Sequence, residues 1–126
     1  MAENSTNKQM IIKAIVSEFS GRFRVFDNTA DSKKVITGQF PDVIIMRQEP
    51  PVNQDILFVM KIEEDDNNLI DSVPEWQALA SAPSVLYIVV PKIKLDEAKK
   101  LASATGVRAR FAPYTIGANS ARVRYE

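Results

Sequence analysis

Three charged side chains, Asp42, Lys61 and Glu63, are the residues of this sequence best placed to do chemistry together. Asp42 opens one apolar run, and Lys61 and Glu63 stand near the end of a second run at 56–63. Because side chains alternate along a strand, Lys61 and Glu63 point to one face, which Asp42 reaches if the two strands pair. The chain has no histidine and no cysteine, so its chemistry must use carboxylates, lysines, hydroxyls or a hard metal bound through oxygen.

The length and composition indicate one domain with a real core. The chain has 126 residues, of which 45% are hydrophobic, and no apolar run approaches the length of a membrane span. The first residues are polar and do not resemble a signal peptide, and the absence of cysteine excludes a disulfide framework. We therefore expect a cytoplasmic protein without a membrane partner, folded as a single domain over 1–126 with flexible ends at 1–7 and 117–126.

Charge is unevenly distributed along a chain whose net charge is zero. The zero net charge argues weakly against a dedicated nucleic-acid binder. Residues 49–75 are strongly acidic, however, and residues 92–126 are basic. Two interpretations remain open: a metal region and a phosphate-facing surface, or two solvated faces with no partner.

Hydrophobic periodicity predicts an α/β fold with a mixed sheet. A helix from Thr6 or Asn7 to Ser20 precedes a three-strand antiparallel meander, since short loops favour antiparallel neighbours. Ser72 and Glu75 fit a capping box at the start of the next helix. The remaining expected elements are the meander strands at 23–26, 41–46 and 56–63, a central parallel strand at 85–90, a helix at 95–105 and an edge strand at 107–112. Residues 33–37 either pair back or lead into the second strand.

The Pro41-Asp42 dipeptide, a strand ending in paired polar groups, and this order of elements resemble the PD-(D/E)XK nuclease superfamily. The resemblance covers roughly residues 8–115. It is closest to small prokaryotic members in which a Glu-x-Glu or Glu-x-Lys strand end is followed by a Trp-bearing helix and a strand ending in Val-Val-Pro. The corresponding stretches here are 58–66, 73–80 and 85–91. The resemblance implies a three-layer restriction-endonuclease-like core.

The resemblance also implies an activity, because this superfamily hydrolyses phosphodiesters with magnesium. Asp42 matches the first metal ligand, but the family's second acid falls on Lys61 and its lysine falls on Glu63. The implied catalytic residues are Asp42, Glu63 and Lys61, and the implied magnesium ligands are Asp42 and Glu63 with Glu18 from the first helix. The alternative is structural: Asp42 caps a strand, and Lys61 and Glu63 form an ion pair beside it.

Three functions remain open at this point. The first is a divergent nuclease-fold domain, catalytically weak or inactive, with a binding or scaffold role in DNA metabolism. The second is an active magnesium-dependent DNA endonuclease, and the third is a protein-interaction module that does not bind nucleic acid. The residues expected to contact DNA phosphates are Lys92, Lys94, Arg108 and Arg110, although these charges also suit an edge that resists aggregation. The resemblance further suggests a homodimer.

Overall fold

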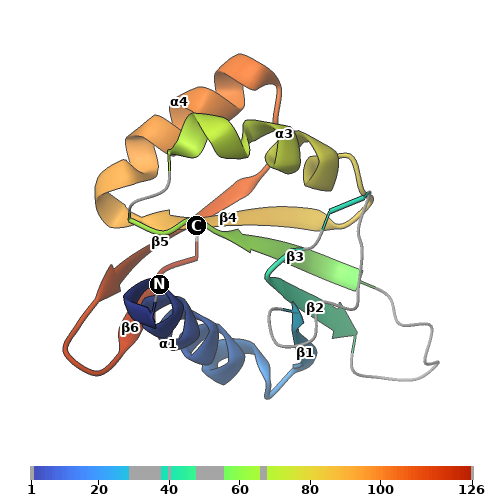
Figure 1. Ribbon diagram of the computed structural model, residues 1–126. Coiled ribbons are helices and arrows are strands. Elements are labelled where there is room, and N and C mark those ends of the chain that lie inside the picture. The colour runs from blue at the N-terminus through green and yellow to red at the C-terminus, as the bar shows by residue number, and fades with distance from the viewer. Residues whose placement is uncertain (1, 29–37, 40, 48–55, 66–67, 126) are drawn as a thin grey trace.

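A computed structural model of the chain describes residues 2–28, 38–39, 41–47, 56–65 and 68–125, and the side chains from residue 7 onward (Figure 1). The expected segment 33–37 lies outside the described residues. The elements in chain order are helix α1 (Ala2–Phe19), strands β1 (Phe23–Asp27), β2 (Val43–Arg47) and β3 (Ile56–Ile62), helix α3 (Leu69–Ala80), strand β4 (Val85–Pro91), the 3-10 turn η1 (Lys92–Lys94), helix α4 (Leu95–Thr105), and strands β5 (Arg110–Ile116) and β6 (Ala121–Val123).

The strands form one mixed six-stranded sheet in the order β1-β2-β3-β4-β5-β6. The expected antiparallel meander of β1, β2 and β3 is confirmed, and so is the parallel pairing of β4 with β3. β5 is parallel to β4, and β6 returns antiparallel to β5. The carboxyl ends of β3, β4 and β5 therefore meet at one end of the sheet, where the amino end of β2 also lies.

Helices cover both faces of the sheet, α1 on one side and α3 with α4 on the other (Figure 1). The apolar stripe of α1, Ile11, Ile12 and Ile15, packs on alternate residues of β2 and β3. The opposite residues of the same strands pack against α3 and α4, with Trp76 of α3 fully buried. Trp76 is thus a core residue, as its place in the apolar pattern indicates.

Helix α3 begins earlier than the capping-box pattern predicts. Asn68 is its N-cap, and the Asn68 side chain accepts a hydrogen bond from the amide of Ile70 at 3.3 Å. The predicted cap, Ser72, lies inside the helix and turns its hydroxyl toward Glu63 instead. The sequence offers two good capping residues four positions apart, and burial of Leu69 in the core favours the earlier one.

The carboxyl-terminal segment differs most from expectation. β5 starts later than the predicted strand at 107–112, and it is not an edge, because β6 pairs with its outer side. The amide of Gly117 donates to the carbonyl of Ser120 at 2.7 Å and closes the turn between the two strands. Ala121 of β6 is then buried against α1, so the segment 117–126 contains a strand that the sequence did not predict.

Candidate functional site

Asp42 is held at the amino end of β2 by its own backbone. Its amide donates to the carbonyl of Met60 at 2.9 Å, and its carbonyl accepts from the amide of Asn28 at 3.0 Å. The Asn28 side chain also donates to the carbonyl of Pro41 at 2.9 Å. These contacts fix the direction of the Asp42 side chain, which is 7% exposed.

The carboxylate of Asp42 is occupied by three nitrogen donors. The ammonium of Lys8, from α1, lies 2.7 Å from Oδ1. The amide of Ile62 donates to Oδ2 at 2.7 Å, and the ammonium of Lys61 lies 3.8 Å from the same oxygen. A buried carboxylate is stabilised by such partners, because they replace the hydrogen bonds and charge screening of water. Two cations therefore surround the position at which the resemblance implies a metal ion.

Lys61 bridges two acidic side chains from different elements. Its ammonium lies 3.8 Å from Asp42 and 3.4 Å from Oε1 of Glu75 on α3. Burial lowers the pKa of Lys61, but the negative charges of Asp42, Glu75 and Glu63 outweigh it and raise the pKa above the usual 10.5. Lys61 is therefore a fixed cation at neutral pH and a poor proton acceptor.

Glu63 is fully buried and serves as a hydrogen-bond acceptor for α3. Its Oε1 accepts from the hydroxyl of Ser72 at 2.8 Å, and its Oε2 accepts from the indole N–H of Trp76 at 3.0 Å. The main chain is fixed as well: the Glu63 amide donates to Val89, and the Glu63 carbonyl accepts from the hydroxyl of Tyr114. Lys61 and Glu63 thus both contact α3, as strand alternation predicts, yet they do so through different partners.

Glu18, the third predicted metal ligand, does not join this group. Helix α1 presents Lys8 to Asp42, and Glu18 lies ten residues further along, roughly 15 Å along the helix axis. It is exposed and faces Tyr125 near β6. Among the residues that the structure describes, no cluster of three or more acidic side chains has metal-site geometry.

Magnesium does not fit the donors at this position. Mg²⁺ requires hard oxygen ligands in near-ideal octahedral geometry. A magnesium ion at Asp42 would lie beside the positive charges of Lys8 and Lys61, and Glu63 directs both of its oxygens toward donors of α3. The arrangement can hold four secondary-structure elements together, but Asp42 and Glu63 do not form a vacant carboxylate pair.

Sequence reasoning missed Lys8 and Glu75. Lys8 lies four residues before Ile12 and seven before Ile15, on the inward stripe of α1. A lysine on an apolar stripe is a signal that it has a buried partner, since an unpaired buried ammonium is costly. The signal does not say which acid it meets, because that depends on how α1 crosses the sheet.

The four predicted phosphate-binding residues fall into two groups. Lys92 and Lys94 follow β4, at the same end of the sheet as Asp42. Arg108 precedes β5 and Arg110 opens it, and Arg110 pairs with Tyr87 while Tyr114 pairs with Pro91. The register places the arginine pair roughly 13 Å from the lysine pair along the strands, so the four do not form one surface.

No protein family, no curated protein and no solved structure matches this chain. None of the described helices is both long enough and apolar enough to cross a membrane.

Proposed function

We propose that this protein is a divergent, catalytically inactive domain of the restriction-endonuclease-like fold that serves as a binding or scaffold module. One observation carries the proposal: in Asp42, the residue that matches the family's first metal ligand, Lys8 contacts Oδ1 and the Ile62 amide donates to Oδ2, with the Lys61 ammonium 3.8 Å from Oδ2. The order of helix, antiparallel meander, helix and parallel strand supports the assignment of the fold.

The loss of activity follows from the chemistry of phosphodiester cleavage. The reaction needs positive charge beside the scissile phosphate and a hydroxide formed near neutral pH, and a bound metal supplies both. Here the ammonium groups neutralise Asp42 internally, so the carboxylate has little charge left to recruit a cation. Lys61, with its raised pKa, does not take a proton from water at neutral pH.

The contacts around Asp42 support a scaffold role, because they join four elements of the fold. The site binds α1, β2, β3 and α3 together through a chain of charged contacts from Lys8 through Asp42 and Lys61 to Glu75. Such a network holds these helices and strands in fixed relative positions and so preserves the surface that they form. DNA is our first candidate partner, because basic side chains follow β4 at this end of the sheet.

A cleavage assay with metal tests the proposal. The purified protein is incubated with single-stranded, duplex and branched DNA in Mg²⁺ or Mn²⁺, beside Asp42→Ala prepared identically. We expect no cleavage above the level of the Asp42→Ala sample. Metal-dependent cleavage that Asp42→Ala abolishes would overturn the proposal in favour of an active endonuclease.

A further inference from the structure

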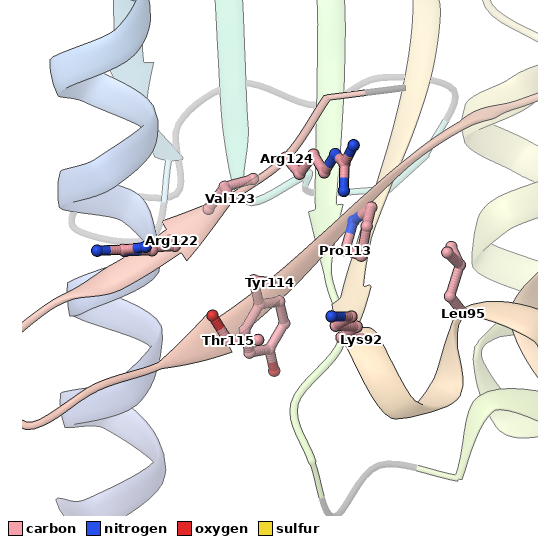
Figure 2. A pocket seen from close by; sticks show the side chains of 8 residues that line it. All are labelled: Lys92, Leu95, Pro113, Tyr114, Thr115, Arg122, Val123 and Arg124. Atoms are coloured by element: carbon pink, nitrogen blue, oxygen red, sulfur yellow. The ribbon is translucent and has the colours of Figure 1, made fainter.

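A cleft of about 470 Å³ lies where β5 and β6 extend beyond α4, and its cations come from two separate segments (Figure 2). Lys92 belongs to η1, and Arg122 and Arg124 belong to β6 and its continuation. The amide of Arg124 donates to the carbonyl of Pro113 at 2.9 Å, which places Arg124 at this cleft. The Arg122 side chain points away from Lys92 and Arg124 in Figure 2, and Arg122 also borders a second pocket beside Ser17 and Glu18 of α1. The sequence brings these residues together only through the β5–β6 hairpin.

The cations of the cleft are available to a ligand. Lys92, Arg122 and Arg124 are exposed, and none of them forms an ion pair with a residue that the structure describes. Figure 2 shows Arg124 beside Pro113 on the same side as Lys92, while Arg122 lies at the outer rim. No acidic side chain belongs to the described part of the cleft lining, so the positive charge is uncompensated locally.

The floor of the cleft is apolar. Leu95 and Pro113 contribute to it, and the hydroxyl of Thr115 adds a polar group on the side of Arg122. The volume lies within the range of small-molecule sites, which combine an apolar lining with a few placed polar groups. An inorganic anion alone would leave the floor uncovered, whereas a phosphate carrying a sugar and a base would cover it.

We propose that this cleft binds a nucleotide phosphate, either in a free nucleotide or in a nucleic-acid strand. Lys92 and Arg124 hold the phosphate oxygens, Arg122 contacts a second phosphate or the strand at the rim, and Leu95 and Pro113 pack against the sugar and base. Nucleotides meet both requirements, because each one combines a charged phosphate with a sugar and a base.

The cleft opens at the same end of the sheet as the Asp42 group. The hydroxyl of Tyr114, on β5, donates to the carbonyl of Glu63 at 2.8 Å and joins the two regions. This inference deepens the proposed binding role and rests on it for its biological meaning. Its geometry is independent of Asp42, and so is its test.

Binding is measured at low salt in EDTA with three probes: inorganic phosphate, adenosine 5′-monophosphate, and a short fluorescein-labelled oligodeoxythymidylate. The test variant is Lys92→Ala/Arg124→Ala. The matched control is Lys100→Ala/Arg22→Ala, which removes the same charges from exposed positions outside the cleft. Thermal unfolding checks that both variants fold, and Arg122→Ala gives a separate single-site readout.

We expect the test variant to weaken nucleotide or oligonucleotide binding by at least about tenfold, and the control by less than about twofold. For the oligonucleotide, losing two phosphate contacts lowers the slope of log affinity against log salt by about 1.4. If adenosine 5′-monophosphate and the oligodeoxythymidylate bind with equal affinity per site, the ligand is a free nucleotide. If only the oligodeoxythymidylate binds, the ligand is a nucleic acid.

Two results would overturn the inference. Equal weakening in the two double variants would mean that binding follows diffuse charge and not this cleft. Failure of every probe to bind the wild-type protein would mean that the cleft is not a nucleotide site. Because EDTA is present throughout, neither result depends on whether the protein cleaves DNA with metal, which the assay of Asp42→Ala decides separately.

Discussion

Asp42→Asn distinguishes a structural charge network from a metal site by the sign of its effect on stability. In a metal site, carboxylates repel one another without metal, so neutralising one of them leaves stability unchanged or raises it. In the arrangement seen here, the same substitution leaves Lys8 and Lys61 facing an uncharged amide. We therefore expect Asp42→Asn to be destabilised in EDTA.

The magnitude follows from the three contacts of the carboxylate. The 2.7 Å contact with Lys8 is a charge-assisted hydrogen bond, and losing it costs about 1.5–3 kcal/mol. Lys61 lies 3.8 Å from the carboxylate and keeps Glu75 as a partner, so losing the contact between Lys61 and Asp42 adds only about 0.2–1 kcal/mol. The Ile62 amide can still donate to the asparagine oxygen. Lys8 is 26% exposed and recovers some hydration, so we expect a total near the lower end, roughly 2–3 kcal/mol.

Urea unfolding at neutral pH in EDTA measures this loss. Asp65→Asn is the matched control, because Asp65 is exposed and should change stability by no more than about 0.5 kcal/mol. Lys8→Met, alone and combined with Asp42→Asn, completes a double-mutant cycle with an expected coupling of about 1–2 kcal/mol. An Asp42→Asn protein as stable as the wild type, or more stable, would refute the reasoning.

Three further predictions concern Glu63 and Lys61. Glu63→Gln should lower the free energy of unfolding by about 1–3 kcal/mol in urea, because a neutral amide replaces the carboxylate that accepts charge-assisted hydrogen bonds from Trp76 and Ser72; an unchanged midpoint would contradict those contacts. Lys61→Glu should be destabilised in EDTA and partly rescued by Mn²⁺, since it places a third carboxylate beside Asp42 and Glu75; equal stability with and without Mn²⁺ would be contrary evidence. Because folding raises the pKa of Lys61, the stabilisation that its positive charge provides is complete below pH 10.5 and is lost as pH rises through the pKa of the folded protein. The difference in unfolding free energy between wild type and Lys61→Met should therefore shrink above pH 10.5. A difference that stays constant with pH would argue against the raised pKa.

The local pattern of the sequence was sufficient for most of the sheet. The unbroken apolar run at Val85–Pro91 predicts a strand buried on both faces, and the structure places it between β3 and β5. Gly106 ends α4 with a φ of 73°, a left-handed conformation that glycine adopts without strain. In both places a short-range property of the residues decides the structure.

Non-local pairing explains what the sequence could not predict. β6 has three residues, and nothing in their order distinguishes a strand from a polar tail until β5 and α1 provide partners. The pairing of Lys8 with Asp42 depends in the same way on the crossing of α1 over the sheet. Lys61 and Glu63 were correctly placed on one face, but their separate partners, Glu75 and Trp76, depend on where α3 begins.

The same limit applies to the basic residues. Lys92 could be recognised as a candidate phosphate ligand from its place after β4, but Arg122 and Arg124 lie in a segment without predicted structure. Arg108 and Arg110 are as basic in sequence, yet the register of β5 places them toward the other end of the sheet. Composition predicts a basic surface, but the pairing of β5 with β6 determines that Lys92, Arg122 and Arg124 border the same cleft.

Paramagnetic broadening by Mn²⁺ in NMR spectra tests the central claim most directly, because the amide of Ile62 donates to Asp42 and reports on any ion bound there. If Asp42 belongs to a charge network and not to a metal site, the Ile62 amide signal broadens no more than that of the exposed Asp65 as Mn²⁺ is added through the submillimolar range. Saturable broadening centred on Ile62, absent in Asp42→Asn, would show that the carboxylate binds a metal ion and would contradict the account.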